Sequence, residues 1–221
     1  MGKRIVIHAG LPKTGTTSIQ QFLVETHAAI DAAGIMFPCI DDPQHPGYFR
    51  EGVGHGPQAD LISFMTPTPY AGAPSGIDWP AALDRFAASR DHHTLLLSQE
   101  NVAMRGAAIH PPVLNRLRAI GEVVFLVYLR NAVRWVASLH VQRTTGQNLF
   151  AIWPEDDPTL RRYLQKGYAP FLGPLQRRGR LVVADFDACA ARGDLLADFC
   201  RRTGLAEVLA ANPATPSANV A

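Results

Sequence analysis

Short apolar runs, separated by polar and by glycine- and proline-rich connections, dominate the pattern of this chain. Four of the runs are continuously apolar, which is typical of strands buried on both faces of a sheet. They lie at residues 4–9, 94–98, 123–129 and 181–184. The third run is the longest, and we expect it to form the central strand. A shorter extended piece at 35–38 ends in proline, which favours an edge strand because proline cannot donate to a ladder.

Patterns with helical spacing follow these runs. We expect helices at about residues 16–33, 57–65, 79–89, 112–120, 133–141, 157–172 and 195–203. Gly34 and Gly204 mark helix ends, and Asp78 is a candidate N-cap. Strand followed by helix, four times, predicts an α/β fold: a three-layer sandwich with a central, mostly parallel sheet flanked by helices. Ligands of such sheets bind beyond the carboxyl ends of the strands.

Length and composition indicate one globular domain. The chain has 221 residues, of which 47% are hydrophobic and 18% charged, and this suffices for a sizeable core. We expect the domain to span residues 1–211 and residues 212–221 to form a loose tail. Residues from about 39 to 78 are rich in proline and glycine, which predicts a long insertion.

Charge and cysteine content narrow the possible partners. A net charge of +2 without a long basic block argues against a nucleic-acid partner. Three cysteines without a paired spacing indicate neither a disulfide framework nor a metal site. No apolar run approaches the roughly 18–20 residues that a membrane span needs. We therefore expect a cytoplasmic protein that uses no metal.

The first strand leads into a glycine-containing loop with one lysine. Gly10 and Gly15 flank Lys13, and a helical pattern begins at about Thr16. A strand, a glycine loop and a helix N-terminus together favour an anion, because loop N–H groups and the helix dipole both attract negative charge. The two glycines have the spacing of the nucleoside-triphosphate loop, but Thr16 stands where that motif has its lysine. This departure argues against ATP or GTP as the ligand.

Three segments resemble the PAPS-dependent sulfotransferase family in its bacterial-type form, which has a P-loop-like fold. Residues 12–17, Pro-Lys-Thr-Gly-Thr-Thr, are similar to its 5′-phosphosulfate-binding loop. A strand that ends in Arg130, with Ser138 eight residues later on a helix, is similar to its 3′-phosphate site. Ala132 departs from the proline that the family usually has there. Residues 181–205 resemble its closing strand and helix more weakly.

The resemblance implies a nucleotide co-substrate. PAPS is 3′-phosphoadenosine 5′-phosphosulfate, and its product is 3′,5′-diphosphoadenosine. The residues assigned to PAPS by the resemblance are Pro12, Lys13, Thr14, Gly15, Thr16, Thr17, Ser18, Arg130 and Ser138. Lys13 is also assigned to catalysis, because its charge would lie where negative charge develops on the leaving phosphate. The acceptor would be a hydroxyl or amine of a small molecule or glycan, and carbohydrate, lipid and phenolic acceptors all stay open.

The acceptor proton needs a base, and two residues are candidates. Glu100 follows the strand at 94–98 and is expected to point into the site. His55 belongs to the insertion, from which it could reach over the acceptor. We favour Glu100. Aromatic residues expected to line the acceptor pocket together with His55 are Tyr48, Phe49, Tyr70 and Trp79.

Two alternative functions stay open. The chain could be a nucleotide or small-molecule kinase, in which Asp185, directly after the strand at 181–184, would hold magnesium. It could also be a nucleotide-binding protein without catalytic activity, for which Lys13 and Glu100 would be replaceable without consequence.

Overall fold

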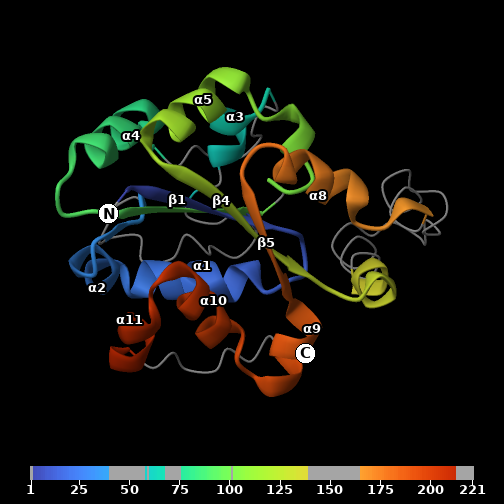
Figure 1. Cartoon of the computed structure of the whole chain (residues 1–221). Coiled ribbons are helices and arrows are strands. Elements are labelled where there is room, and N and C mark those ends of the chain that lie inside the picture. Colours follow the sequence, from blue (N-terminus) through green and yellow to red (C-terminus); the bar gives the residue numbers. More distant parts are fainter. Residues whose placement is uncertain are drawn as a thin grey trace.

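A five-stranded, all-parallel sheet forms the centre of the molecule (Figure 1). The computed structural model describes residues 2–39, 58, 60–67, 76–100, 102–138 and 165–212. The strands are β1 (Arg4–Gly10), β2 (Ile35–Met36), β3 (Thr94–Glu100), β4 (Glu122–Leu129) and β5 (Arg180–Asp185), in the order β2-β3-β1-β4-β5. The predicted α/β sandwich is confirmed, and so is the edge position of the short strand β2.

The expectation that residues 123–129 form the central strand is wrong. The middle strand is β1, and β4 lies between β1 and β5. Both β1 and β4 are covered on both faces, so both read as continuous apolar runs. A long apolar run indicates that both faces of a strand are buried. The position of the strand in the sheet depends instead on how the connections cross.

Helices cover both faces of the sheet (Figure 1). One layer holds α3 (Leu61–Met65), α4 (Trp79–Ala88), α5 (Pro111–Ile120) and α8 (Ala169–Gln176). The other holds α1 (Thr16–Glu25), α2 (His27–Ala32), α9 (Phe186–Arg192), α10 (Leu195–Thr203) and α11 (Ala206–Ala211). A 3₁₀ turn spans Gly106–Ala108, and residues 132–138 are helical. No helix of the described residues is long and apolar enough to cross a membrane.

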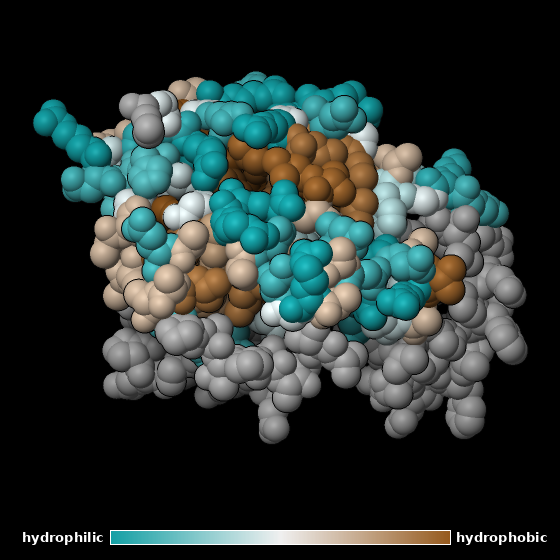
Figure 2. Space-filling model, turned by 60° about the horizontal axis from the view of Figure 1, so that its bottom comes forward, coloured by the Kyte–Doolittle hydropathy of each residue, from teal (hydrophilic) through white to brown (hydrophobic). Residues whose placement is uncertain are grey.

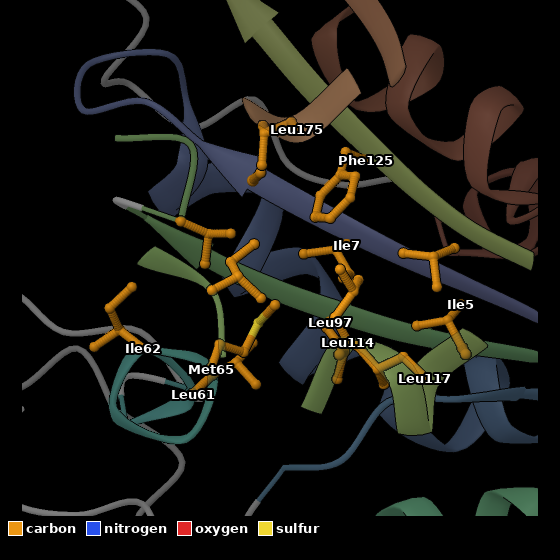
Figure 3. Close-up of a cluster of buried hydrophobic side chains, with 14 of the residues drawn as sticks. Ile5, Ile7, Leu61, Ile62, Met65, Leu97, Leu114, Leu117, Phe125 and Leu175 are labelled. Atoms are coloured by element: carbon orange, nitrogen blue, oxygen red, sulfur yellow. The ribbon is translucent and has the colours of Figure 1, made fainter. Parts of the chain in front are cut away.

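Alternate residues of the strands feed two separate cores, as the two-residue period of a strand requires. In β1, Ile5 and Ile7 face α3, α4 and α5, where they meet the buried cluster of Figure 3. Val6, between them, packs against α1 and α10 on the opposite face. In the coloured part of the face that Figure 2 turns forward, hydrophilic side chains cover much of the surface, with hydrophobic areas between them.

His8, which follows Ile7 on β1, is a packed core residue. It is fully buried, and its Nδ1 lies 2.9 Å from Ser98 Oγ on the neighbouring strand. Burial lowers the pKa of His8 to about 4, so the imidazole is neutral at physiological pH. This residue therefore belongs to the framework beneath the loop and carries no charge to it.

One helix prediction needs correction, and a second falls partly outside the described residues. The helix expected at 16–33 is interrupted at Thr26, whose hydroxyl donates 2.7 Å to the Phe22 carbonyl while its backbone leaves the helical region at φ −108° and ψ 17°. Side-chain bonds of this kind compete with the helical ladder. Of the helix expected within 157–172, the structure describes residues 165–166, which are helical, and Gly167 at φ 57° separates them from α8, which begins at Ala169. Residues 157–164 lie outside the described part.

Of the insertion expected at about 39–78, the structure describes residues 39, 58, 60–67 and 76–78. Helix α3 buries Leu61, Ile62 and Met65, as the sequence predicted. Trp79 is only 5% exposed, stacks on Phe64 at a ring-centroid distance of 6.0 Å and donates its indole N–H to Asp60. The expectation that Trp79 lines the acceptor pocket is therefore wrong, because packing against α3 takes its ring into the core. The other aromatic candidates, Tyr48, Phe49 and Tyr70, lie outside the described residues.

Candidate phosphate-binding site

The loop between β1 and α1 has the shape of an anion-binding turn. β1 ends at Gly10, α1 begins at Thr16, and Gly15 precedes the helix in the left-handed region at φ 74°. The Thr14 hydroxyl is fully buried and donates 2.7 Å to the Leu11 carbonyl, which closes the loop on itself. No side chain caps the N-terminus of α1, so its first-turn N–H groups are available to an anion by helical geometry.

Close packing explains why glycine stands at both ends of the loop. A Cβ atom at Gly10 would lie 2.7 Å from Thr16 Oγ1. A Cβ atom at Gly15 would lie 2.3 Å from Leu195 Cδ2 of α10, which is itself buried. The loop is thus pressed against both its own helix and the helical layer below it.

We expect Gly15→Ala to destabilise the fold more than Gly193→Ala. Both glycines adopt positive φ angles, 74° and 68°, and alanine in that region costs about 1–2 kcal/mol. A Cβ atom at Gly193 meets nothing within 4 Å, whereas one at Gly15 crowds Leu195 and adds roughly 1–3 kcal/mol. Urea denaturation of the two variants measures the difference in free energy of unfolding, and equal losses would contradict the packing argument.

Side chains that follow the carboxyl end of β4 bind the carbonyl groups of the loop. The Trp135 indole N–H donates 2.8 Å to the Pro12 carbonyl. Arg130 Nη1 donates to the Lys13 carbonyl at 3.4 Å. Lys13 itself adopts a left-handed conformation at φ 65°, which is unusual for a residue with a side chain. The loop is therefore fixed from outside, by the strand end and helix that also carry the predicted 3′-phosphate residues.

The hydroxyl residues at the start of α1 differ in exposure. Thr16 is 4% exposed, and its buried Oγ1 has no hydrogen-bond partner among the residues that the structure describes. Such a hydroxyl is costly to leave unpaired, and a ligand oxygen in the loop would satisfy it. Thr17 is exposed and Ser18 is half-buried. The orphaned Thr16 hydroxyl fits the prediction that this loop takes an oxyanion.

The structure brings Lys13 and Glu100 together. Gly10 pairs with Glu100 in the register of β1 and β3, which places the carboxyl directly beside the loop. Burial raises the pKa of the Glu100 carboxyl, while the Lys13 ammonium and, less strongly, the Lys13 backbone N–H act in the opposite direction. A carboxylate with a raised pKa beside a cation is an arrangement suited to proton transfer.

Arg130 joins the same edge of the sheet from β4. Its guanidinium lies over the Phe186 ring at 5.4 Å, and its Nε, 3.6 Å from Asp187 Oδ1, is buried without a hydrogen bond. Arg134 Nη1 lies 3.7 Å from the same carboxylate oxygen, and the Asn131 backbone N–H donates to Asp187 Oδ2. Within the described residues Arg130 Nε is thus an unused donor, which a phosphate oxygen could take.

An open depression of about 780 Å³ lies beside this arginine. Its lining comes from the carboxyl ends of β4 and β5 and from the two segments that follow them, and includes both Arg130 and Asp187. Val133 and Val183, exposed to 72% and 44%, contribute apolar surface to it. Sequence reasoning missed Asp187, because nothing in its spacing from Arg130 indicates that α9 returns to the end of β4.

The departure at Ala132 does not prevent the helix from starting there. The Asn131 side-chain oxygen accepts from the backbone N–H groups of Val133 and Arg134 at 3.1 and 3.3 Å. An asparagine N-cap thus replaces the proline that the family usually has. Ser138, at the end of the described helical residues, is half-buried.

The remaining candidates have different outcomes. Asp185, the magnesium ligand of the kinase alternative, accepts from the Ala188 backbone N–H at 2.9 Å and caps α9. Among the described residues no group of three or more metal-ligating side chains is found. His55 lies outside the described residues. The carboxyl-edge positions of Lys13, Glu100 and Arg130 are as predicted, and their chemical roles stay predictions.

Comparisons with known proteins support the fold. No protein-family model matches the chain, and no curated protein sequence matches it at a significant level. Among solved structures, it is similar to a sulfotransferase from Alicyclobacillus acidocaldarius, with a TM-score of 0.50 and 14% sequence identity. The match covers 93% of this chain and 82% of that one. At this identity the likeness concerns the fold: the chain has the α/β architecture of a structurally characterised sulfotransferase.

Proposed function

We propose that this protein is a sulfotransferase that moves a sulfuryl group from PAPS to a hydroxyl or amine of an acceptor. The proposal rests on one observation: Glu100 and Arg130 both lie beside the loop that contains Lys13. Arg130 donates to the Lys13 carbonyl, and the Lys13 ammonium acts on the Glu100 carboxyl. Three segments far apart in the chain thus bring the predicted base, cation and phosphate-binding arginine to one edge.

The residues present fit a nucleotide with charge at both its 5′ and 3′ ends. Residues 12–18 would hold the 5′-phosphosulfate with loop and helix N–H groups, and the unpaired Thr16 hydroxyl would donate to it. Arg130 would bind the 3′-phosphate with its guanidinium, whose Nε lacks a hydrogen bond within the described residues, and Ser138 would donate a further bond. The carboxylate of Asp187 lies beside Arg130 and would have to give way to that phosphate.

In the proposed reaction PAPS supplies the sulfuryl group. Glu100 takes the proton of the acceptor as the acceptor oxygen or nitrogen forms its bond to sulfur. The bond between sulfur and the 5′-phosphate oxygen breaks, and Lys13 stabilises the charge left on that phosphate, which departs as 3′,5′-diphosphoadenosine. His55 stays the alternative base. The insertion at about 39–78 is the proposed acceptor side, and the acceptor is a small molecule or glycan.

Thermal stabilisation separates the proposal from the kinase alternative. We expect 3′,5′-diphosphoadenosine to raise the melting temperature with concentration, since a ligand at 100 times its Kd adds about 2.7 kcal/mol to the folded state. ATP with magnesium should stabilise less, because Asp185 caps α9 and Thr16 replaces the lysine of an ATP loop. Adenosine 5′-monophosphate is the matched control for the 3′-phosphate. Stabilisation by ATP with magnesium alone would favour a kinase.

Transfer of labelled sulfate from PAPS to a panel of carbohydrate, phenolic and lipid acceptors then tests catalysis. Stabilisation by 3′,5′-diphosphoadenosine without transfer to any of them would favour the non-catalytic alternative.

A further inference from the structure

Trp135 connects the helix after β4 to the loop after β1. Its side chain is fully buried and packs with Val136 and Phe171 in a small cluster of its own. Its indole N–H crosses to the loop and donates 2.8 Å to the Pro12 carbonyl, 123 positions away in the sequence. A large, buried ring held by its neighbours has little freedom, so this donor is fixed in place.

The bond that Trp135 makes controls the direction of the next N–H group. The peptide between Pro12 and Lys13 is trans, so its C=O and its N–H point in opposite directions. The C=O points to Trp135. The N–H, on the other side of the same plane, acts on the Glu100 carboxyl and favours its ionised form. One rigid peptide therefore lies between the indole and the carboxyl.

We propose that Trp135 is a positioning residue of the transfer reaction, because it orients the Pro12–Lys13 peptide and thereby sets the relation between Lys13 and Glu100. This inference rests on the proposed function, in which those two residues are the cation and the base. It assigns to the indole N–H a role that neither the loop nor Glu100 reveals by itself.

The left-handed backbone of Lys13 depends on the hydrogen bond from the Trp135 indole to the Pro12 carbonyl, which we call the clamp. A residue with a side chain at φ 65° occupies a sparsely populated region, and such conformations persist only where the surroundings enforce them. Trp135 and Arg130 take the carbonyls before and after this α-carbon. Without the indole N–H, the peptide is free to turn toward a more ordinary conformation, and the Lys13 N–H leaves Glu100.

The test compares Trp135→Phe with Trp79→Phe in the full chain. Each variant removes one indole N–H from a buried ring, but the Trp79 indole donates at 3.3 Å to Asp60, away from the loop. Hydrogen exchange of a peptide covering residues 11–18 reports the clamp directly. We expect Trp135→Phe to speed exchange there about tenfold, as the loss of one hydrogen bond of roughly 1.4 kcal/mol would, and Trp79→Phe to leave it unchanged.

Kinetics supply a readout that a merely structural role would not move. Because a small misplacement of reacting groups is costly in rate, kcat should fall about tenfold or more in Trp135→Phe, with a smaller change in the KM for PAPS. Lys13 is the charged side chain that acts on Glu100 within the described residues. Once the Lys13 N–H no longer favours the carboxylate, the acidic limb of kcat/KM moves to higher pH. Trp79→Phe should show neither effect.

The outcomes distinguish the hydrogen bond of Trp135 from its role in the reaction, and both from the proposed function. Equal exchange of residues 11–18 in the two variants would overturn the clamp, whatever the kinetics. Faster exchange in Trp135→Phe, with kcat and the acidic limb as in Trp79→Phe, would overturn its role in positioning the reacting groups. A parent protein that neither binds 3′,5′-diphosphoadenosine nor transfers sulfate would overturn the proposed function and with it this inference, even if exchange upheld the clamp as a structural contact.

Discussion

Replacing Lys13 by alanine is expected to lower the rate of sulfuryl transfer by about 10²- to 10³-fold, the usual loss for one group that stabilises developing charge. Its ammonium acts on the edge where Glu100 and Arg130 converge. Alanine has the same difficulty as lysine at φ 65°, so the backbone of the loop gains no new strain. The loss should therefore fall on kcat rather than on folding.

The measurement is single-turnover transfer from PAPS, with thermal unfolding recorded on the same samples. Arg85→Ala is the control, because Arg85 is exposed near the end of α4 that Lys3, just before β1, contacts. It should transfer sulfate at the parent rate. A Lys13→Ala variant that did the same would remove the electrostatic basis of the proposed mechanism and leave the loop as a binding turn.

The second large effect is expected at Glu100. Glu100→Gln keeps the shape of the side chain but cannot accept a proton, so transfer should fall by about 10²- to 10⁴-fold. Since only the ionised carboxyl can act as a base, the parent should lose activity as the pH falls through the pKa of Glu100. Burial raises that pKa, so the acidic limb of the pH–rate profile should lie at a higher pH than the ordinary pKa of a carboxyl group.

The same pKa shift predicts the effect on stability. A carboxyl group whose pKa is higher in the folded than in the unfolded state stabilises the fold at low pH, and that contribution is lost as the pH rises through the folded pKa. Above its folded-state pKa the ionised Glu100 therefore contributes nothing to stability through this shift. Glu100→Gln should then lose activity without losing stability, a combination that a structural residue would not show.

The control for this variant is Glu207→Gln on the exposed surface of α11. Rates and unfolding curves should match those of the parent. If Glu100→Gln transferred sulfate normally while His55→Ala did not, the base would be assigned to His55, and Glu100 would keep only its place beside the loop.

The sequence by itself determined the classes of element and the place of the glycine loop between the first strand and the first helix. Continuous apolar runs identified β1, β3 and β4, which are covered on both faces, and also β5, an edge strand on which Val183 is 44% exposed. Gly34 and Gly204 marked helix ends that the structure finds at φ 73° and 88°. Asp78 caps α4, as its position before the helical pattern indicated. These signals are local: they depend on burial, backbone conformation and hydrogen bonds within a few residues of the same segment, and a sequence records them directly.

The tertiary structure alone decided which distant groups meet. The order of the strands places β1 at the centre and brings Glu100 beside Gly10, although both strand patterns look alike in sequence. The contacts of Trp135 with Pro12 and of Asp187 with Arg130 join residues that no periodicity relates. Such pairings follow from how the connections cross the sheet and from how helices pack on it, and these are properties of the whole chain rather than of any one stretch.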